Sequence, residues 1–121
     1  MSMELDFWKY KDNVAHNHAI VYTTACCDGK LMEELENLPT DGILKRISAV
    51  FSGWTIQNDG KDFEKEGHGA FQIFTTEQIV RFDCYGMQEK DMNALMDILA
   101  DFGCPLYDPQ ISERFDAWTD K

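Results

Sequence analysis

The hydrophobic pattern changes along residues 70–103 from the period of a strand to the period of a helix. Residues 70–76 (AFQIFTT) and 78–85 (QIVRFDCY) alternate between apolar and polar side chains, which predicts a hairpin. Gly103 occupies the position after a helix where glycine is favoured. An amphipathic helix is predicted over 88–102, and its buried stripe comprises Met92, Leu95, Met96, Leu99 and Phe102. A hairpin followed directly by such a helix predicts a sheet that is covered by the helix.

The first half of the chain predicts one central strand and a second amphipathic helix. Residues 18–27 are apolar or β-branched on both alternating sides, which indicates a strand covered on both faces. Residues 31–38 have helical spacing that Pro39 interrupts, so they form either a first helix or the start of a kinked one. The helix predicted over 41–51 has a stripe of Ile43, Leu44, Ile47, Val50 and Phe51.

Five shorter segments complete the expected structure. Residues 5–10 predict a short strand or a strap over the core, and 54–57 predict a short strand. The charged, glycine-rich segment 58–69 predicts a loop. Residues 105–107 and 111–115 predict two short strands joined by a turn.

The predicted order is strand, helix, strand, strand, helix, strand, which is the order of a ferredoxin-like split βαβ sandwich. We therefore expect an α+β fold, a ferredoxin-like two-layer sandwich with a mainly antiparallel sheet and two main helices on one face. The length of 121 residues fits a single domain over 1–121. A hydrophobic content of 44% is typical of a globular chain, so neither a metal nor a disulfide is needed for folding.

The chain is strongly acidic, with 22 acidic residues against 11 basic ones and a formal net charge of −11. Such a surface repels phosphate backbones and anionic lipids, so we expect no binding to nucleic acid and none to a membrane surface. No segment approaches the roughly 20 apolar residues of a membrane span, and the N-terminus lacks the pattern of a signal peptide. A cytoplasmic location with four reduced cysteines is therefore expected.

Residues 15–30 (AHNHAIVYTTACCDGK) bring two histidines and two cysteines close together in the sequence. On a strand, His16 and His18 would share one side, but His18 and Cys26 would lie about 26 Å apart. Cys26 and Cys27 would point to opposite faces and are expected to be small buried apolar residues. The pattern therefore predicts no metal site and no cofactor, and it leaves the role of His16 and His18 open.

The sequence indicates no catalytic machinery. It contains no glycine-rich phosphate loop, no GxSxG and no visible nucleophile triad. Residues 55–66 place Gly60 and Glu66 as a calcium loop would, but Thr55 and Gln57 stand where carboxylates or amides are needed. A binding role is therefore expected in preference to an enzymatic one.

The helix predicted over 88–102 carries the candidate partner-binding residues Glu89, Asp97 and Asp101. Asn93, Asp97 and Asp101 recur every four residues and so line its solvent face. Asp97 and Asp101 oppose the helix dipole near the C-terminal end, and they also repel each other. A basic partner would explain these charges, and an ordinary solvated face is the alternative.

In size, charge and lack of a catalytic motif, the chain resembles the small acidic immunity and antidote proteins that block basic bacterial toxins. The resemblance implies a non-catalytic protein that docks on a basic protein partner and inhibits it. The alternative is a small ferredoxin-like enzyme or ligand-binding domain with a pocket on the open sheet face. Its site would use Tyr22, Arg81, Asp83 or the histidine pair His16 and His18.

A homodimer is compatible with both functions. An edge strand such as 54–57 or 111–115 can pair with its copy across a twofold axis. The tryptophans Trp8, Trp54 and Trp118 would then seal the interface or simply cap the core.

Overall fold

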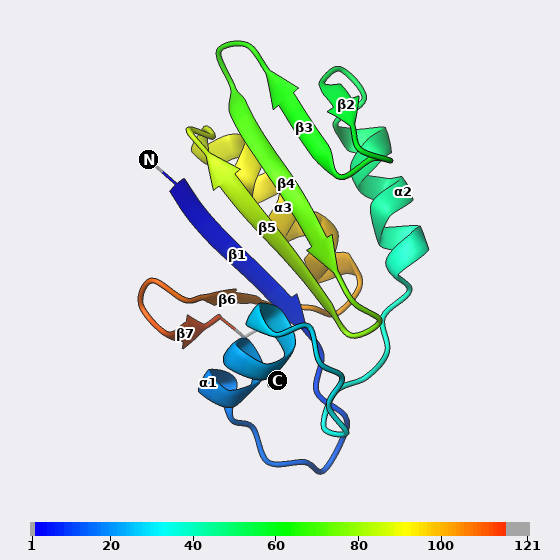
Figure 1. Ribbon diagram of the computed structural model, residues 1–121, viewed down its shortest axis with the longest axis vertical. Coiled ribbons are helices and arrows are strands. Elements are labelled where there is room, and N and C mark those ends of the chain that lie inside the picture. Colours follow the sequence, from blue (N-terminus) through cyan, green and yellow to red (C-terminus); the bar gives the residue numbers. More distant parts are fainter. Residues whose placement is uncertain (1, 116–121) are drawn as a thin grey trace.

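An antiparallel sheet of seven strands organises the chain, and the computed structural model describes residues 2–115 of it (Figure 1). The elements in chain order are β1 (Ser2–Trp8), α1 (His18–Val21), the π-helix η1 (Tyr22–Cys27), α2 (Thr40–Val50), β2 (Thr55–Gln57), β3 (Asp62–Lys65), β4 (Gly69–Thr75), β5 (Ile79–Tyr85), α3 (Glu89–Asp101), β6 (Leu106–Asp108) and β7 (Glu113–Arg114). The strands lie in the order β2-β3-β4-β5-β1-β6-β7. The expected α+β class with an antiparallel sheet is confirmed.

β1 occupies a central position in the sheet. It pairs with β5 over its whole length, from Ser2 opposite Tyr85 to Trp8 opposite Ile79, and its other edge pairs with β6. The sequence predicts only a short strand or a strap over 5–10, because this segment is rich in aromatic residues that suit either. Long-range pairing on both edges turns this segment into a full strand of the sheet.

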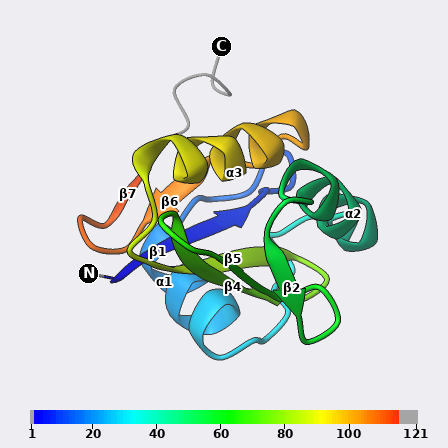
Figure 2. The ribbon, with the colours of Figure 1, turned by 90° about the horizontal axis from the view of Figure 1, so that it is seen from above.

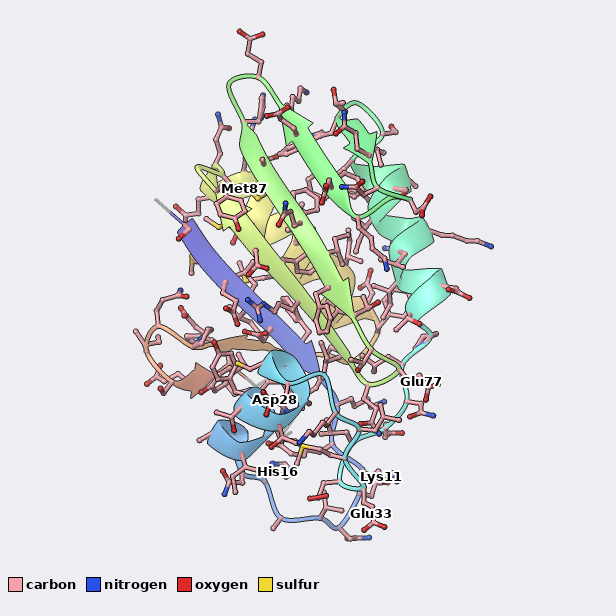
Figure 3. The ribbon with its side chains drawn as sticks, in the orientation of Figure 1. Lys11, His16, Asp28, Glu33, Glu77 and Met87 are labelled. Carbon is pink, nitrogen blue, oxygen red and sulfur yellow. The ribbon has the colours of Figure 1, made fainter. Side chains whose placement is uncertain are left out.

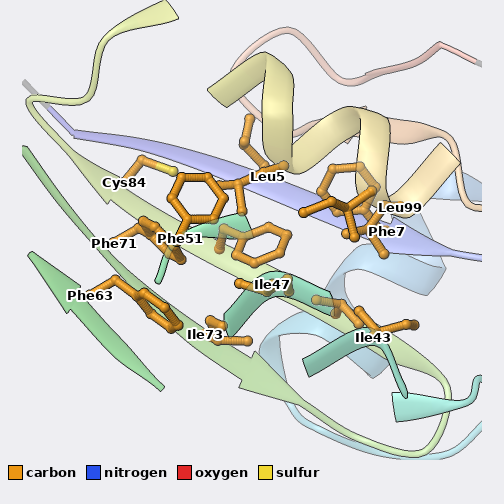
Figure 4. Close-up of a cluster of buried hydrophobic side chains, with 14 of the residues drawn as sticks. Leu5, Phe7, Ile43, Ile47, Phe51, Phe63, Phe71, Ile73, Cys84 and Leu99 are labelled. Carbon is orange, nitrogen blue, oxygen red and sulfur yellow. The ribbon is translucent and has the colours of Figure 1, made fainter. Parts of the chain in front are cut away.

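The main core lies between one face of the sheet and the helices α2 and α3, which Figure 2 shows on the same side. This is the position that the sequence predicts for the two main helices. Aromatic rings fill the centre, and Phe63 stacks on Phe71 with their ring centroids 4.6 Å apart (Figure 4). Leu5 and Phe7 reach this core from β1.

A second, smaller core lies on the opposite face, under α1 and η1 (Figure 2). Trp8 and Ile79 contribute to it from the sheet, and Val21, Ala25 and Cys26 contribute from the helical segment. This segment adds a partial layer that the two-layer expectation does not include. Trp8 and Trp54 are therefore buried core residues, and Trp118 lies outside the described residues.

The strand predicted over 18–27 is wrong, because these residues form α1 and η1. A run that is apolar on all sides fits a buried helix as well as a buried strand, and β1 takes the central place in the sheet. Local hydrogen bonds support the helix: the Asn17 side chain accepts from the Ile20 backbone N–H, and the Thr23 hydroxyl donates to the Ala19 carbonyl. Cys26 is buried as expected, but Cys27 is exposed.

Two further expectations need correction. Residues 31–38 form no helix, because their backbone bonds to distant segments: Leu35 bridges to Tyr10, and the Gln78 side chain bonds to both the N–H and the carbonyl of Met32. The segment 58–69 is a loop only in part, since it contains β3. The hairpin of β4 and β5, the helices α2 and α3, and the short strands β2, β6 and β7 agree with prediction.

Candidate functional site

α1 and η1 cover only one end of their face of the sheet, so the other end, formed by β2 to β5, is left open (Figure 1). Figure 3 shows His16 and Asp28 at the covered end and Met87 at the opposite end. Residues that are directly opposite in neighbouring strands point to the same face. The register therefore places two rows of side chains on this face: Gln57, Asp62, Gln72, Asp83 and Glu4 in one, and Thr55, Glu64, Ala70, Tyr85 and Ser2 in the other. We call these two rows the open sheet face.

The open sheet face is hollowed. A pocket of about 190 Å³ is lined by Thr55, Gln57, Asp62, Phe63, Glu64, Ala70, Phe71, Gln72 and Tyr85. This lining includes two carboxylates, those of Asp62 and Glu64, and none of its described residues is basic. A neighbouring depression of about 580 Å³ shares Glu64 and Tyr85 and adds Glu66 and Lys65. The hollow therefore suits a small group that carries positive charge.

A seam of charged side chains, which includes Glu4 and Asp83 of the first row, lies at the end of the open sheet face where η1 begins to cover it. Arg81 lies at its centre, with Nη2 3.2 Å from Glu4 Oε1 and 3.1 Å from Asp83 Oδ1. Arg81 Nη1 also donates to the Cys26 carbonyl oxygen at 3.3 Å. All three charged side chains are mostly buried, so the contacts are shielded from solvent. Arg81 thus ties two strands of the sheet to η1.

Asp6 lies at the buried end of this seam. It is fully buried, and the side chains of Glu4 and Cys26 are its close polar neighbours. Burial raises the pKa of Asp6 to about 9, and the neighbouring Glu4 carboxylate raises it further, while Cys26 and Arg81 act in the opposite direction. Asp6 therefore holds a proton at neutral pH. Burial also raises the pKa of the Cys26 thiol, which faces Asp6.

The structure brings together three residues that the sequence nominates for a pocket on the sheet, Tyr22, Arg81 and Asp83. Arg81 and Asp83 are in contact, and Tyr22 lies on η1 near Glu4. Burial raises the pKa of the Tyr22 hydroxyl, with smaller contributions from Cys27 and Glu4. Glu4 and Asp6 are missed by the sequence reasoning. The period-two alternation in residues 3–8 (MELDFW) is the signal that places both carboxyls on one face.

The histidine pair belongs to a cluster of rings. The His16 ring stacks on Tyr10 with a centroid distance of 3.9 Å, and the Tyr10 hydroxyl lies 2.7 Å from His18 Nδ1. Within residues 2–115, no group of three or more His, Cys, Asp or Glu side chains is placed to hold a metal ion. His16 and His18 therefore serve ring packing in the described structure.

The predicted partner-binding residues Glu89, Asp97 and Asp101 are exposed on α3. Asp101 Oδ2 lies 2.6 Å from Arg46 Nη2 of α2, so its charge is partly compensated within the chain. Glu89 and Asp97 form no ion pair within the part of the chain that the structure describes. Their role in binding a partner remains a prediction.

Comparison with known proteins identified no relative of this chain. No protein-family model, no curated protein and no solved structure matches the chain. Among residues 2–115, no helix combines the length and apolar character that crossing a bilayer requires. Inference about function therefore rests on the open sheet face, the charged seam and α3.

Proposed function

We propose that this chain is a small acidic binding protein that docks on a basic protein partner and inhibits it, in the manner of immunity and antidote proteins. The observation that carries the proposal is the composition of the pocket on the open sheet face, whose described lining holds two carboxylates and no basic residue. An uncovered sheet surface of this kind offers charge complementarity to a lysine or arginine side chain.

The pocket by itself has room for a partner's side chain, and the depression of about 580 Å³ beside it has room for the adjoining part of the partner. Pockets that enclose a drug-sized ligand measure about 300–1,000 Å³, whereas this one measures about 190 Å³. Carboxylates such as Asp62 and Glu64 accept charge-assisted hydrogen bonds from a guanidinium group, and Tyr85 offers an aromatic face beside them. One basic side chain of a docked protein would therefore fit the hollow as an anchor.

The open sheet face is a better docking surface than α3. Asp101 already pairs with Arg46, which leaves Glu89 and Asp97 as the uncompensated acidic groups among the predicted residues of that helix. We therefore assign Glu89, Asp97 and Asp101 to a secondary acidic surface. Its long-range attraction would speed the approach of a basic partner without supplying the anchoring contact.

A ligand-binding or enzymatic role is the second candidate, and the convergence of Tyr22, Arg81 and Asp83 favours it. A neutral carboxyl such as Asp6 beside a guanidinium is a combination that active sites use. Asp6 is, however, fully buried beneath η1, and the pocket lining does not include it. The charged seam is therefore better suited to holding η1 on the sheet than to contacting a substrate.

We also propose a fold type, a cellular location and an alternative assembly for this protein. The order β4-β5-β1-β6, with α2 and α3 on one face, supports a ferredoxin-like unit to which β2, β3 and β7 are added. We further propose a cytoplasmic location and, as an alternative assembly, a homodimer that pairs through the edge strand β2.

Two charge-reversed variants test which surface binds. The first is Asp62→Lys with Glu64→Lys on the open sheet face, and the second is Asp97→Lys with Asp101→Lys on α3. Both change the net charge equally, so each is the control for the other. A basic protein is first captured from native lysate at low and at high salt and identified by mass spectrometry. Its affinity and association rate for each purified variant are then measured by surface plasmon resonance at both salt concentrations.

We expect the sheet variant to lose binding to the purified partner by about a hundredfold or more, as removal of an anchoring charge pair does. The α3 variant should mainly slow association and reduce its dependence on salt. Equal binding by wild type and the sheet variant would refute docking through the open sheet face. Retention of no protein at either salt concentration would remove the basis for a basic partner.

A further inference from the structure

An aromatic box lies at the covered end of the sheet, away from the open sheet face. It consists of the rings of Trp8, Tyr10, His18 and Tyr107, whose neighbouring centroids are 5.1–6.2 Å apart. The rings come from β1, the segment after β1, α1 and β6. Residues far apart in the sequence therefore converge on one site.

A cation already occupies this box. The Arg114 Cζ atom lies 5.2 Å from the centroid of the Trp8 ring and 4.8 Å from that of Tyr10, both within the range of a cation–π interaction. Arg114 Nη2 also donates a hydrogen bond of 2.6 Å to the Trp8 carbonyl oxygen. The box thus recognises a guanidinium group by two ring faces and one backbone acceptor.

One polar group of the box has no partner among the described residues. Trp8 is fully buried, and its indole Nε1–H donates to no acceptor there. A buried donor without an acceptor costs free energy, because its hydrogen bond to water is lost on folding. A peptide that brought an arginine into the box would carry carbonyl oxygens able to accept from this group.

The strand that carries Arg114 is weakly anchored. β7 has two residues and lies at the end of the sheet. Within residues 2–115 its partner strand is β6, with Tyr107 opposite Arg114 and Asp108 opposite Glu113. Ser112, which precedes β7, has a φ of +54°, a left-handed conformation that is strained for a side chain other than glycine. Short edge strands are the elements that open first, because few contacts must break.

We propose that the aromatic box is a binding site for an arginine side chain of a basic protein partner, and that Arg114 fills it until that arginine takes its place. Exchange of one guanidinium for another keeps the cation–π contacts, and the incoming peptide adds an acceptor for the indole of Trp8. This inference does not rest on docking through the open sheet face, because the two sites use different residues.

The test measures binding of N-acetyl-arginine amide through the indole N–H signal of Trp8 in nuclear magnetic resonance spectra, assigned with Trp8→Phe. Arg114→Ala empties the box, and Glu113→Ala is the control on the same strand. We expect the Trp8 signal of Arg114→Ala to shift and saturate at probe concentrations at least about tenfold lower than those needed for wild type and Glu113→Ala. In the latter two proteins Arg114 fills the box and so reduces the apparent affinity for the probe. N-acetyl-glutamine amide, which lacks the charge, should cause no shift, and the Trp54 signal should not move.

A second measurement uses the unmodified protein. The Phe115 amide donates to the Leu106 carbonyl at 2.7 Å, so its hydrogen exchange reports the release of β7. The proposal requires this amide to exchange faster than the amides of β5, since Arg114 must leave without global unfolding. Exchange at the rate of global unfolding overturns the proposal.

Two further results also overturn it. One is a folded Arg114→Ala protein whose Trp8 signal does not respond to the arginine probe. The other is an equal response in wild type, which would show that Arg114 does not occupy the binding site. If Arg114→Ala does not fold, Arg114→Gln, which keeps part of the side-chain stem, is titrated in its place with the same criteria.

Discussion

A side chain at Gly69 would collide with the backbone at Tyr85. A Cβ atom built on Gly69 lies 2.6 Å from the carbonyl oxygen of Tyr85 and 2.6 Å from that of Gly86, and Gly69 has a φ of +93°. Both carbonyl groups are backbone and cannot move aside without disturbing β5. Glycine is therefore required where β4 begins, beside the depression on the open sheet face.

Replacement of this glycine should be strongly destabilising. We expect Gly69→Ala to lower the free energy of unfolding by about 2–4 kcal/mol, from the left-handed φ and the backbone clash together. Gly67→Ala is the matched control, because Gly67 has a φ of +79° and open space around it. Urea unfolding of both variants measures the difference, and equal losses would show that the close approach to Tyr85 is unimportant.

The buried carboxyl of Asp6 should make stability depend on pH. Its pKa of about 9 in the folded state lies above the ordinary value of 3.8, so the folded state retains a proton that the unfolded state loses. The contribution of Asp6 to the stability of the folded state is fully present below pH 4 and is lost progressively as the pH rises toward 9. Asp6→Asn keeps a neutral side chain at every pH and should remove this pH dependence. The free energy of unfolding of Asp6→Asn minus that of wild type should therefore increase as the pH rises.

Urea unfolding between pH 4 and pH 9 measures this difference. The exposed Asp28→Asn is the control, since it removes a carboxyl outside the charged seam. A constant difference between wild type and Asp6→Asn over the whole range would contradict a protonated Asp6.

Arg81 should contribute more to stability than an arginine in an exposed ion pair. Arg81→Met leaves Glu4, Asp83 and the Cys26 carbonyl without their shared donor, and we expect a loss of about 1–3 kcal/mol. Arg46→Met breaks the pair with Asp101, in which both side chains are about half exposed, and should cost at most about 1 kcal/mol. Thermal and urea unfolding of the two variants compare them, and similar losses would argue against a structural role for the seam.

Cys27 should be the only cysteine that reacts in the native protein. It is exposed, whereas Cys26, Cys84 and Cys104 are buried. Burial raises the pKa of Cys84 to about 12 and that of Cys104 to about 11, so little thiolate is available at neutral pH. Titration with an aromatic disulfide reagent should release one equivalent of thiolate from native protein and four after denaturation.

Cys27→Ser is the control for this titration. It should abolish the reaction of the native protein and leave three equivalents after denaturation. Rapid reaction of a second thiol in the native wild type would contradict the burial of Cys26, Cys84 and Cys104.

The sequence by itself determined those elements whose pattern is local. The stripe of α3 ends at Gly103, which has the left-handed φ of +79° expected after a helix, and the hairpin of β4 and β5 follows its period-two alternation. The helix α2 forms where its stripe predicts and buries Ile43 and Ile47, but Val50 of that predicted stripe is exposed. Each of these signals is contained in fewer than about 20 consecutive residues, and no distant contact changes it.

The tertiary structure decided the elements whose pattern was ambiguous. Residues 18–27 are apolar on every side, and only the pairing of β1 with both β5 and β6 leaves them to form a helix over the sheet. It also decided the candidate site, because Glu4, Asp6, Arg81 and Asp83 meet only through the register of β1 and β5. Residue types and periodicity are properties of a short segment, whereas which segments become neighbours depends on the free energy of burying the whole chain.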